Sequence, residues 1–168
     1  MHCHYCFGLY FERLKSLLDR TISFGDKVYM GGQTDSSSDF IAPTVLTDVK
    51  SESPIMSEEI FGPILPVLSY ENESEIKDII DNNPTPLAFY IFSKNQTFID
   101  NLIENNKFGG CVVNDTLIHY INPNLPFGGI GDSGMGAYRG KFSFDTFSHL
   151  KPVLRKKSMI DLPFRYGP

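Results

Sequence analysis

The segment with the clearest potential for chemistry is SEEIFGP, at residues 57–63. It places the carboxylate of Glu59 two residues before the aromatic ring of Phe61, and a Gly-Pro pair restricts the chain after them. A carboxylate can accept hydrogen bonds from two adjacent ribose hydroxyls, and an aromatic ring can pack on a flat heterocycle. The alternative is structural: Glu58 and Glu59 begin a helix, where they favour its dipole, and Phe61 enters the core.

Three cysteines could supply a nucleophile or a metal ligand. Cys111 lies in an apolar run, where burial raises the pKa of a thiol and makes it a poor nucleophile. Cys3 and Cys6 have the spacing of zinc ligands, and His2 and His4 lie beside them. A structural zinc site joins two separated ligand pairs, and no second pair follows in the sequence. We therefore expect no metal site.

No other group of residues forms a self-contained catalytic apparatus. His119 and His149 are too far apart in sequence to suggest a catalytic pair. No serine lies in the G-x-S-x-G pattern of a nucleophile elbow. We therefore assign no catalytic residue to this chain.

A glycine pattern at residues 129–134 reads GIGDSG and fits the G-x-G-x-x-G fingerprint of dinucleotide-binding folds. That fingerprint needs a strand before it and a helix after it, so that a phosphate meets the helix N-terminus. Residues 123–127, before the pattern, do not have the character of a strand, and residues 136–140, after it, do not have the character of a helix. We predict that these glycines permit a tight turn against other backbone. The loop around them, residues 120–140, is long and aromatic, and such loops in compact domains are usually functional.

Alternating helix and strand patterns must position these segments. An amphipathic helix is predicted by four apolar residues at helical spacing: Phe11, Leu14, Leu17 and Leu18. Strands are expected at residues 41–46, 64–70, 87–92 and 111–113, the last two covered on both faces. Asn72 with Glu75 resembles a capping box, and Asn95 can cap the following helix. This order implies parallel pairing and an α/β fold.

Composition excludes several classes of protein. The 168 residues carry a net charge of −5, and the pI is about 5.3. Without a basic stripe, no nucleic-acid partner is expected. The chain opens without a signal-peptide pattern, and its apolar runs are far shorter than the ~20 residues of a membrane helix. We expect a cytoplasmic protein with reduced thiols.

Four segments occur in a characteristic order, at residues 42–46, 58–67, 113–116 and 125–136. They read APTVL, EEIFGPILPV, VNDT and LPFGGIGDSGMG. The ordered set resembles the aldehyde dehydrogenase superfamily, and KFSFDTFSH at residues 141–149 resembles its class 3 and fatty-aldehyde branch. The resemblance covers roughly residues 11–157 and implies part of the parallel-sheet catalytic domain.

The resemblance implies roles for particular residues. The Glu59 carboxylate would hydrogen-bond the nicotinamide ribose of NAD or NADP, and Phe61 would pack beside the nicotinamide. Phe127 would line the inner end of the aldehyde tunnel, and Asn114 would brace the neighbouring backbone. The strand at residues 112–113, with the C-terminal segment, would help to form the family's dimer.

The family's catalytic groups match no residue of this chain. A Cys thiolate attacks the aldehyde, a Glu base activates water, and an Asn amide stabilises the oxyanion. In the family these groups and the dinucleotide domain all lie upstream of the matched region. We therefore expect an unmatched segment at residues 1–10, a partial catalytic domain at 11–157 and a tail at 158–168, with no activity of this chain alone. The alternative is a non-catalytic interaction module that dimerises with a full-length relative, because a missing half would expose apolar surface.

Overall fold

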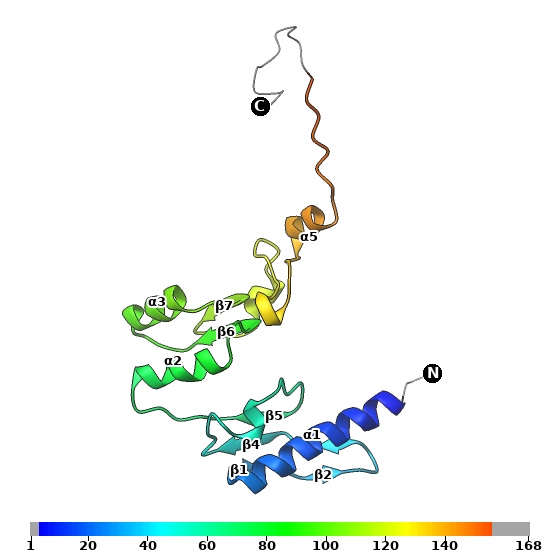
Figure 1. Cartoon of the computed structure of the whole chain (residues 1–168), viewed down its shortest axis with the longest axis vertical. Helices are drawn as coiled ribbons and strands as arrows, with labels where there is room; N and C mark the ends of the chain where they lie inside the picture. Colours follow the sequence, from blue (N-terminus) through cyan, green and yellow to red (C-terminus); the bar gives the residue numbers. More distant parts are fainter. Residues whose placement is uncertain (1–3, 156–168) are drawn as a thin grey trace, which may run out of the picture. The chain divides into compact units, whose positions relative to one another are not determined.

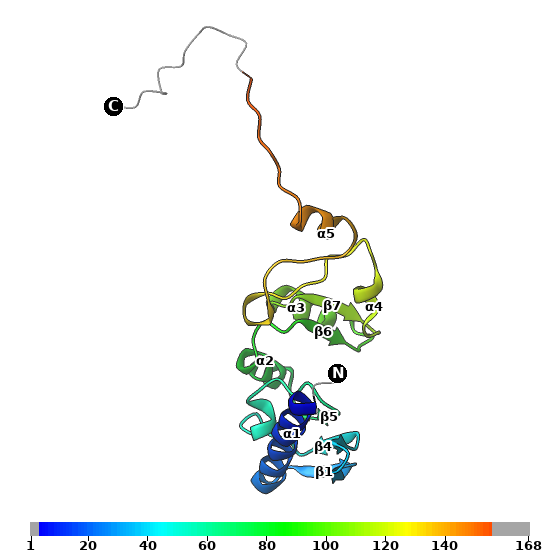
Figure 2. The ribbon, with the colours of Figure 1, turned by 90° about the vertical axis from the view of Figure 1, so that its right-hand side faces the viewer.

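The computed structural model describes residues 4–155 of the chain. The chain divides into two compact units, of which the first ends at Asn83 and the second begins at Pro84 (Figure 1, Figure 2). Each unit combines helices with β-strands, which confirms the α/β class. Within the described range, no helix is both long enough and apolar enough to cross a membrane.

The first unit is built on a three-stranded sheet in the order β1–β4–β5. Strand β1 (Lys27–Met30) pairs antiparallel with β4 (Thr44–Thr47), and β4 pairs parallel with β5 (Ile64–Pro66). A short antiparallel ladder joins β2 (Thr34–Asp35) to β3 (Phe40–Ile41). The sheet therefore contains the expected parallel pair and, in addition, an antiparallel edge strand that the sequence did not indicate.

Helix α1 (His4–Phe24) lies along one face of this sheet (Figure 1). The larger core cluster contains the buried residues Leu17, Leu18, Leu46, Val49, Ile55 and Ile64. A second cluster contains Phe11, Leu14 and Ile41. The predicted amphipathic helix is confirmed, because its four predicted apolar residues are all buried in these two clusters. The 3-10 helix η1 (Pro54–Met56) packs against α1 and leads toward β5.

Helix α2 (Glu73–Asn82) closes the first unit, and its N-terminus differs from the predicted capping box. The Asn72 side chain caps no backbone N–H group. The Glu75 carboxylate instead accepts hydrogen bonds from the Glu71 N–H group at 3.2 Å and from Nδ2 of Asn72 at 3.1 Å. The backbone N–H group that Glu75 binds belongs to Glu71 and not to the cap residue Asn72, so the predicted box has not formed.

The second unit contains a parallel pair of strands, β6 (Ala88–Ile91) and β7 (Gly110–Val113), connected through α3 (Gln96–Asn105). The side chain of Asn95 accepts a hydrogen bond from the Phe98 N–H group at 3.3 Å, which confirms the predicted cap of α3. The short helices α4 (Ile118–Ile121), η2 (Gly131–Ser133) and α5 (Gly140–Thr146) follow β7.

The strands differ from their predicted extents and burial. The strand expected at residues 41–46 is interrupted at Pro43, which has no N–H group to donate to a ladder. The strand expected at residues 64–70 ends at Pro66. Strands β6 and β7 were expected to be covered on both faces, but only Ile91 among their residues is buried in the described structure. The others are half-buried, because the described sheet of this unit has only two strands.

Candidate functional site

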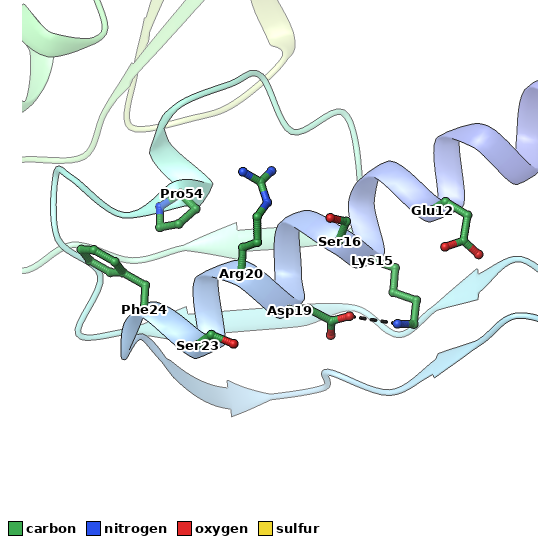
Figure 3. A pocket seen from close by; sticks show the side chains of 8 residues that line it. All are labelled: Glu12, Lys15, Ser16, Asp19, Arg20, Ser23, Phe24 and Pro54. Carbon is green, nitrogen blue, oxygen red and sulfur yellow. Dashed lines mark hydrogen bonds and ion pairs between the residues drawn. The ribbon is translucent and has the colours of Figure 1, made fainter.

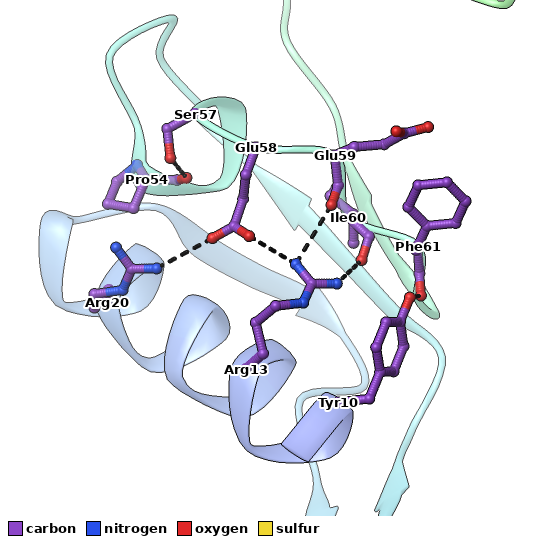
Figure 4. Close-up of polar contacts among 9 residues, drawn as sticks. All are labelled: Tyr10, Arg13, Arg20, Pro54, Ser57, Glu58, Glu59, Ile60 and Phe61. Atoms are coloured by element: carbon purple, nitrogen blue, oxygen red, sulfur yellow. Dashed lines mark hydrogen bonds and ion pairs between the residues drawn. The ribbon is translucent and has the colours of Figure 1, made fainter. Parts of the chain in front are cut away.

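Glu59 and Phe61 lie in the connection between η1 and β5, and both side chains are exposed. Ile60 lies between them, is half-buried, and packs against both core clusters of the first unit. Because Ile60 turns into the core, the side chains on either side of it face away from α1, as Figure 4 shows. The structure thus brings together the carboxylate and the ring that the sequence pairs.

Glu58 is engaged in a different way from its neighbour. Its carboxylate accepts hydrogen bonds from two residues of α1, Arg13 at 2.7 Å and Arg20 at 3.4 Å (Figure 4). The hydrogen bond with Glu58 raises the pKa of the Arg13 guanidinium, so this side chain stays protonated. The Glu59 carboxylate has no ion-pair or hydrogen-bond partner among the described residues, so its oxygens can accept bonds from a ligand.

The backbone of this connection is also held by α1. Arg13 donates hydrogen bonds to the carbonyl oxygens of Glu59 at 3.4 Å and of Ile60 at 2.6 Å. The Tyr10 hydroxyl donates to the carbonyl oxygen of Phe61. Three successive carbonyl groups therefore face the helix, and the side chains of Glu59 and Phe61 are presented on the opposite side (Figure 4).

Two local features let the connection approach α1 so closely. A β-carbon on Gly62 would lie 2.6 Å from a methyl carbon of Leu14, so only glycine fits there without displacing the leucine. Phe61 has a φ of 45°, in the left-handed region that aromatic residues seldom adopt. The surrounding contacts must hold this residue in place, because its intrinsic preference is for negative φ.

The structural alternative for this segment is wrong. Residues 58–61 do not begin a helix, and Phe61 is 69% exposed instead of entering the core. The physical reason is that Ile60 takes the apolar position and that α1 binds the Glu58 carboxylate, which the alternative had assigned to a helix dipole.

Asn114 follows directly after β7 and exchanges two hydrogen bonds with Ser93, which follows β6. Its side-chain oxygen accepts from the Ser93 N–H group, and its amide nitrogen donates to the Ser93 carbonyl, both at 2.9 Å. The residue has a φ of 58°, which asparagine tolerates better than most residues. Its side-chain amide ties the ends of the two parallel strands together.

Phe127 lies at the centre of an aromatic cluster in the second unit. Its ring centroid is 5.5 Å from that of His119, 5.0 Å from that of Tyr120 and 5.8 Å from that of Tyr138. Paired backbone hydrogen bonds of 2.9 Å join Phe127 to Tyr138. The ring also lines a largely apolar hollow of about 510 Å³, whose other walls include Leu87, Met135 and Phe147. This hollow can receive an apolar group.

The glycines of the loop serve close backbone contacts, as predicted. A β-carbon on Gly128 would lie 2.1 Å from the carbonyl oxygen of Gly136, and one on Gly129 would lie 2.1 Å from that of Ser133. The segment before the pattern is not a strand. The short 3-10 helix η2 lies within the pattern, and no helix begins directly after it. The dinucleotide fingerprint is therefore coincidental in this loop.

Cys111, in β7, is half-buried, and burial raises the pKa of its thiol. It is therefore protonated at neutral pH and a weak nucleophile. Cys3 lies outside the described residues, as does the side chain of Cys6, so the zinc-like spacing is not tested there. Among the described residues, no group of three or more His, Cys, Asp or Glu side chains could hold a metal ion.

Sequence patterns gave no indication of three residues that support these sites. Tyr10 is exposed and Arg13 is half-buried, and both lie outside the apolar stripe of α1, which was the only feature of this helix that the sequence indicated. His119 was considered only as half of a catalytic pair, yet it is 6% exposed and packs on Tyr90 and Phe127. Neither of its ring nitrogens has a hydrogen-bond partner in the described structure.

A shallow hollow of about 540 Å³ follows the exposed face of α1 (Figure 3). Half of its lining residues are charged. Two of them, Lys15 and Asp19, pair with each other across one helical turn at 2.9 Å. Spacing of this kind is usual on a solvated helix face. The hollow contains none of the candidate site residues.

Known proteins resemble most of this chain. The Aldehyde dehydrogenase family model matches residues 10–153. Aldehyde dehydrogenase family 3 member A2 of Rattus norvegicus is 50% identical over 147 residues, which are 88% of this chain and 29% of the relative. This similarity confirms the resemblance to the class 3 branch.

Solved structures agree with the sequence comparison. The substrate-bound state of Staphylococcus aureus AldH superposes with a TM-score of 0.82 at 44% identity, over 92% of this chain and 33% of that one. An NAD-dependent aldehyde dehydrogenase from Sinorhizobium meliloti gives a TM-score of 0.82 at 27% identity, over 93% and 31% of the two chains. The chain spans about a third of the length of the curated relatives it matches. Since the family model covers most of its residues, the chain belongs to the aldehyde dehydrogenase family.

Proposed function

We propose that this chain supplies one wall of the cofactor and substrate sites of an enzyme that oxidises an aldehyde to a carboxylic acid with NAD or NADP. The observation that carries the proposal is the presentation of Glu59 and Phe61. Both side chains leave the same connection toward solvent, and the intervening Ile60 is anchored in the core. The neighbouring Glu58 is occupied by arginines, so Glu59 alone is available to a ligand.

The residues present fit the nicotinamide end of such a cofactor. A carboxylate offers two acceptor oxygens, which match the two adjacent hydroxyls of a ribose. The Phe61 ring is 69% exposed and can pack against the nicotinamide ring. When bound, the cofactor would supply a hydride acceptor. Glu59 would hold its ribose, and Phe61 would orient its nicotinamide ring. The similarity to an NAD-dependent relative supports this assignment.

The substrate wall belongs to the second unit. Phe127 would line the inner end of the aldehyde tunnel, because its ring borders an apolar hollow and is fixed by three aromatic neighbours. Asn114 would act on structure and not on substrate, since both polar atoms of its amide are bound to Ser93. An aldehyde with an apolar chain suits this wall.

A chimera tests the cofactor assignment. Residues 10–153 would replace the corresponding third of the Staphylococcus aureus relative, which supplies the remaining catalytic groups. We expect this chimera to produce NADH from hexanal. Glu59→Gln should lower its kcat by about 10- to 100-fold, because an amide replaces one acceptor oxygen and misplaces the nicotinamide.

The matched control is Glu52→Gln, the same change at another exposed carboxylate of the first unit. It should leave kcat and KM within about twofold, as usual for surface changes away from a site. Equal rates for the Glu59 and Glu52 variants in an active chimera would contradict the ribose assignment.

A second candidate function is a non-catalytic module that pairs with a full-length relative. The observation in its favour is strand β7, whose Val112 and Val113 are half-buried on a two-stranded sheet with an unpaired edge in the described structure. Unpaired edges are templates for another strand. This function predicts that the chain and the Staphylococcus aureus relative elute together in size-exclusion chromatography with light scattering. Elution of the chain as a monomer, separate from the relative, would rule out this second function.

A further inference from the structure

We propose that Arg13 and Tyr10 of α1 are positioning residues, which fix the backbone of residues 59–61 so that Glu59 and Phe61 face the cofactor together. The inference rests on the proposed function, because it assigns these side chains to the support of the same site. Neither Arg13 nor Tyr10 would touch the cofactor. Both act on it through the carbonyl groups of the connection.

The first argument is the distribution of hydrogen bonds. Arg13 binds the Glu58 carboxylate at 2.7 Å and two carbonyl oxygens, those of Glu59 at 3.4 Å and Ile60 at 2.6 Å. A guanidinium can do this because its donors form a rigid planar fork. The single ammonium of lysine lacks that geometry. Arg13 therefore fixes both the direction of the segment and its rotation about its own axis.

Tyr10 completes the set of contacts. Its hydroxyl donates to the carbonyl oxygen of Phe61, the next carbonyl in the chain. The guanidinium carbon of Arg13 lies 4.9 Å from the centroid of the Tyr10 ring, so the two side chains support each other. Together they bind three consecutive carbonyl groups, and this leaves the opposite side of the segment to Glu59 and Phe61 (Figure 4).

The second argument is the backbone conformation that these contacts hold. Phe61 has a φ of 45°, which is unfavourable for a residue with a β-carbon. Once its carbonyl is released, residue 61 should relax toward negative φ, and the ring would then turn relative to the Glu59 carboxylate. Strained conformations of this kind persist where the surroundings over-determine them, and they occur often at functional sites.

Arg20 provides a built-in comparison. It lies on the same helix and pairs with the same Glu58 carboxylate at 3.4 Å. It donates to no carbonyl group of residues 59–61 among the contacts of the described structure. The effect of losing a charge partner of Glu58 can therefore be separated from the effect of releasing the backbone.

The test is NMR spectroscopy of the ligand-free 168-residue chain with Arg13→Lys, and Arg20→Lys as matched control. In the unchanged chain, the amides of residues 59–61 should have order parameters of about 0.85, as in rigid backbone. Arg13→Lys should lower them below about 0.6 and weaken the strong intraresidue N–H to Hα contact that a positive φ gives Phe61. Arg20→Lys should change neither signal.

Tyr10→Phe is the second variant and removes one hydroxyl while leaving Arg13 in place. It should loosen Phe61 and leave Glu59 ordered, so it tests the inference even if Arg13→Lys destabilises the unit. Amide signals of β4 report whether the unit remains folded. Two results would overturn the inference. One is that the amide order parameters of residues 59–61 are the same in Arg13→Lys and Arg20→Lys. The other is that the Phe61 signals are unchanged in Tyr10→Phe. No ligand enters this test, so failure of the ribose assignment in the chimera is a separate result.

Discussion

The purified 168-residue polypeptide is expected to produce no NADH above the blank with NAD and either hexanal or benzaldehyde. Cys111, whose side chain the structure describes, is half-buried. Burial raises the pKa of its thiol, so little thiolate forms at neutral pH. On the resemblance given above, we expect the family's nucleophile and base to match no residue of this sequence. Loss of a nucleophile that acts as a unit with its base costs about 10⁶ in rate, judging by a serine protease. The measurement is absorbance of NADH over hours at high protein concentration.

Two controls make this negative result informative. The Staphylococcus aureus relative, assayed under the same conditions, would show that the aldehyde and the cofactor in the assay support NADH production. The chimera that contains residues 10–153 establishes that the same segment works when the missing groups are supplied. Turnover by the polypeptide alone would contradict the expected inactivity of this chain. Loss of that turnover in Cys111→Ala would identify Cys111 as the thiol responsible.

Leu17→Ala is expected to have the largest effect on stability. Leu17 is fully buried at the centre of α1, in the cluster that joins this helix to β4 and β5. Removing a leucine side chain from such a position lowers the free energy of unfolding by about 3–5 kcal/mol, through lost apolar burial and the cavity left behind. That loss is comparable to the whole stability of a small unit. Urea denaturation followed by circular dichroism and by NMR signals of β4 would measure it.

The matched control is Leu9→Ala, because Leu9 lies on the same helix but is 68% exposed. Its effect should stay within about 0.5 kcal/mol. The β6–β7 signals of the second unit serve as an internal reference in both variants. Similar losses for Leu9 and Leu17 would mean that the stripe of α1 does not form the core described above. Since α1 also carries Arg13 and Tyr10, unfolding of the first unit should release residues 59–61 as well.

Local patterns predicted the elements that depend on neighbouring residues. The apolar spacing of α1 requires only that one helix face be buried, and the Asn95 cap requires a donor three residues away. Both are confirmed. The glycine pattern at residues 129–134 was correctly separated from a phosphate loop because its flanks are visible in the sequence. Strand ends were less accurate, since partner strands decide them as much as composition does.

The sequence by itself determined the family and the α/β class. It also suggested which residues form the candidate site. The difference between Glu58 and Glu59 was decided only by tertiary structure. The two carboxylates are chemically identical and adjacent, and Arg13, which binds one of them, lies 45 residues earlier in the chain. The exposure of Phe61 has the same origin, because Ile60 fills the core position and α1 holds the carbonyl groups. Contacts between distant segments form only when the chain folds, so no local periodicity records which of two neighbouring side chains they leave open to a ligand.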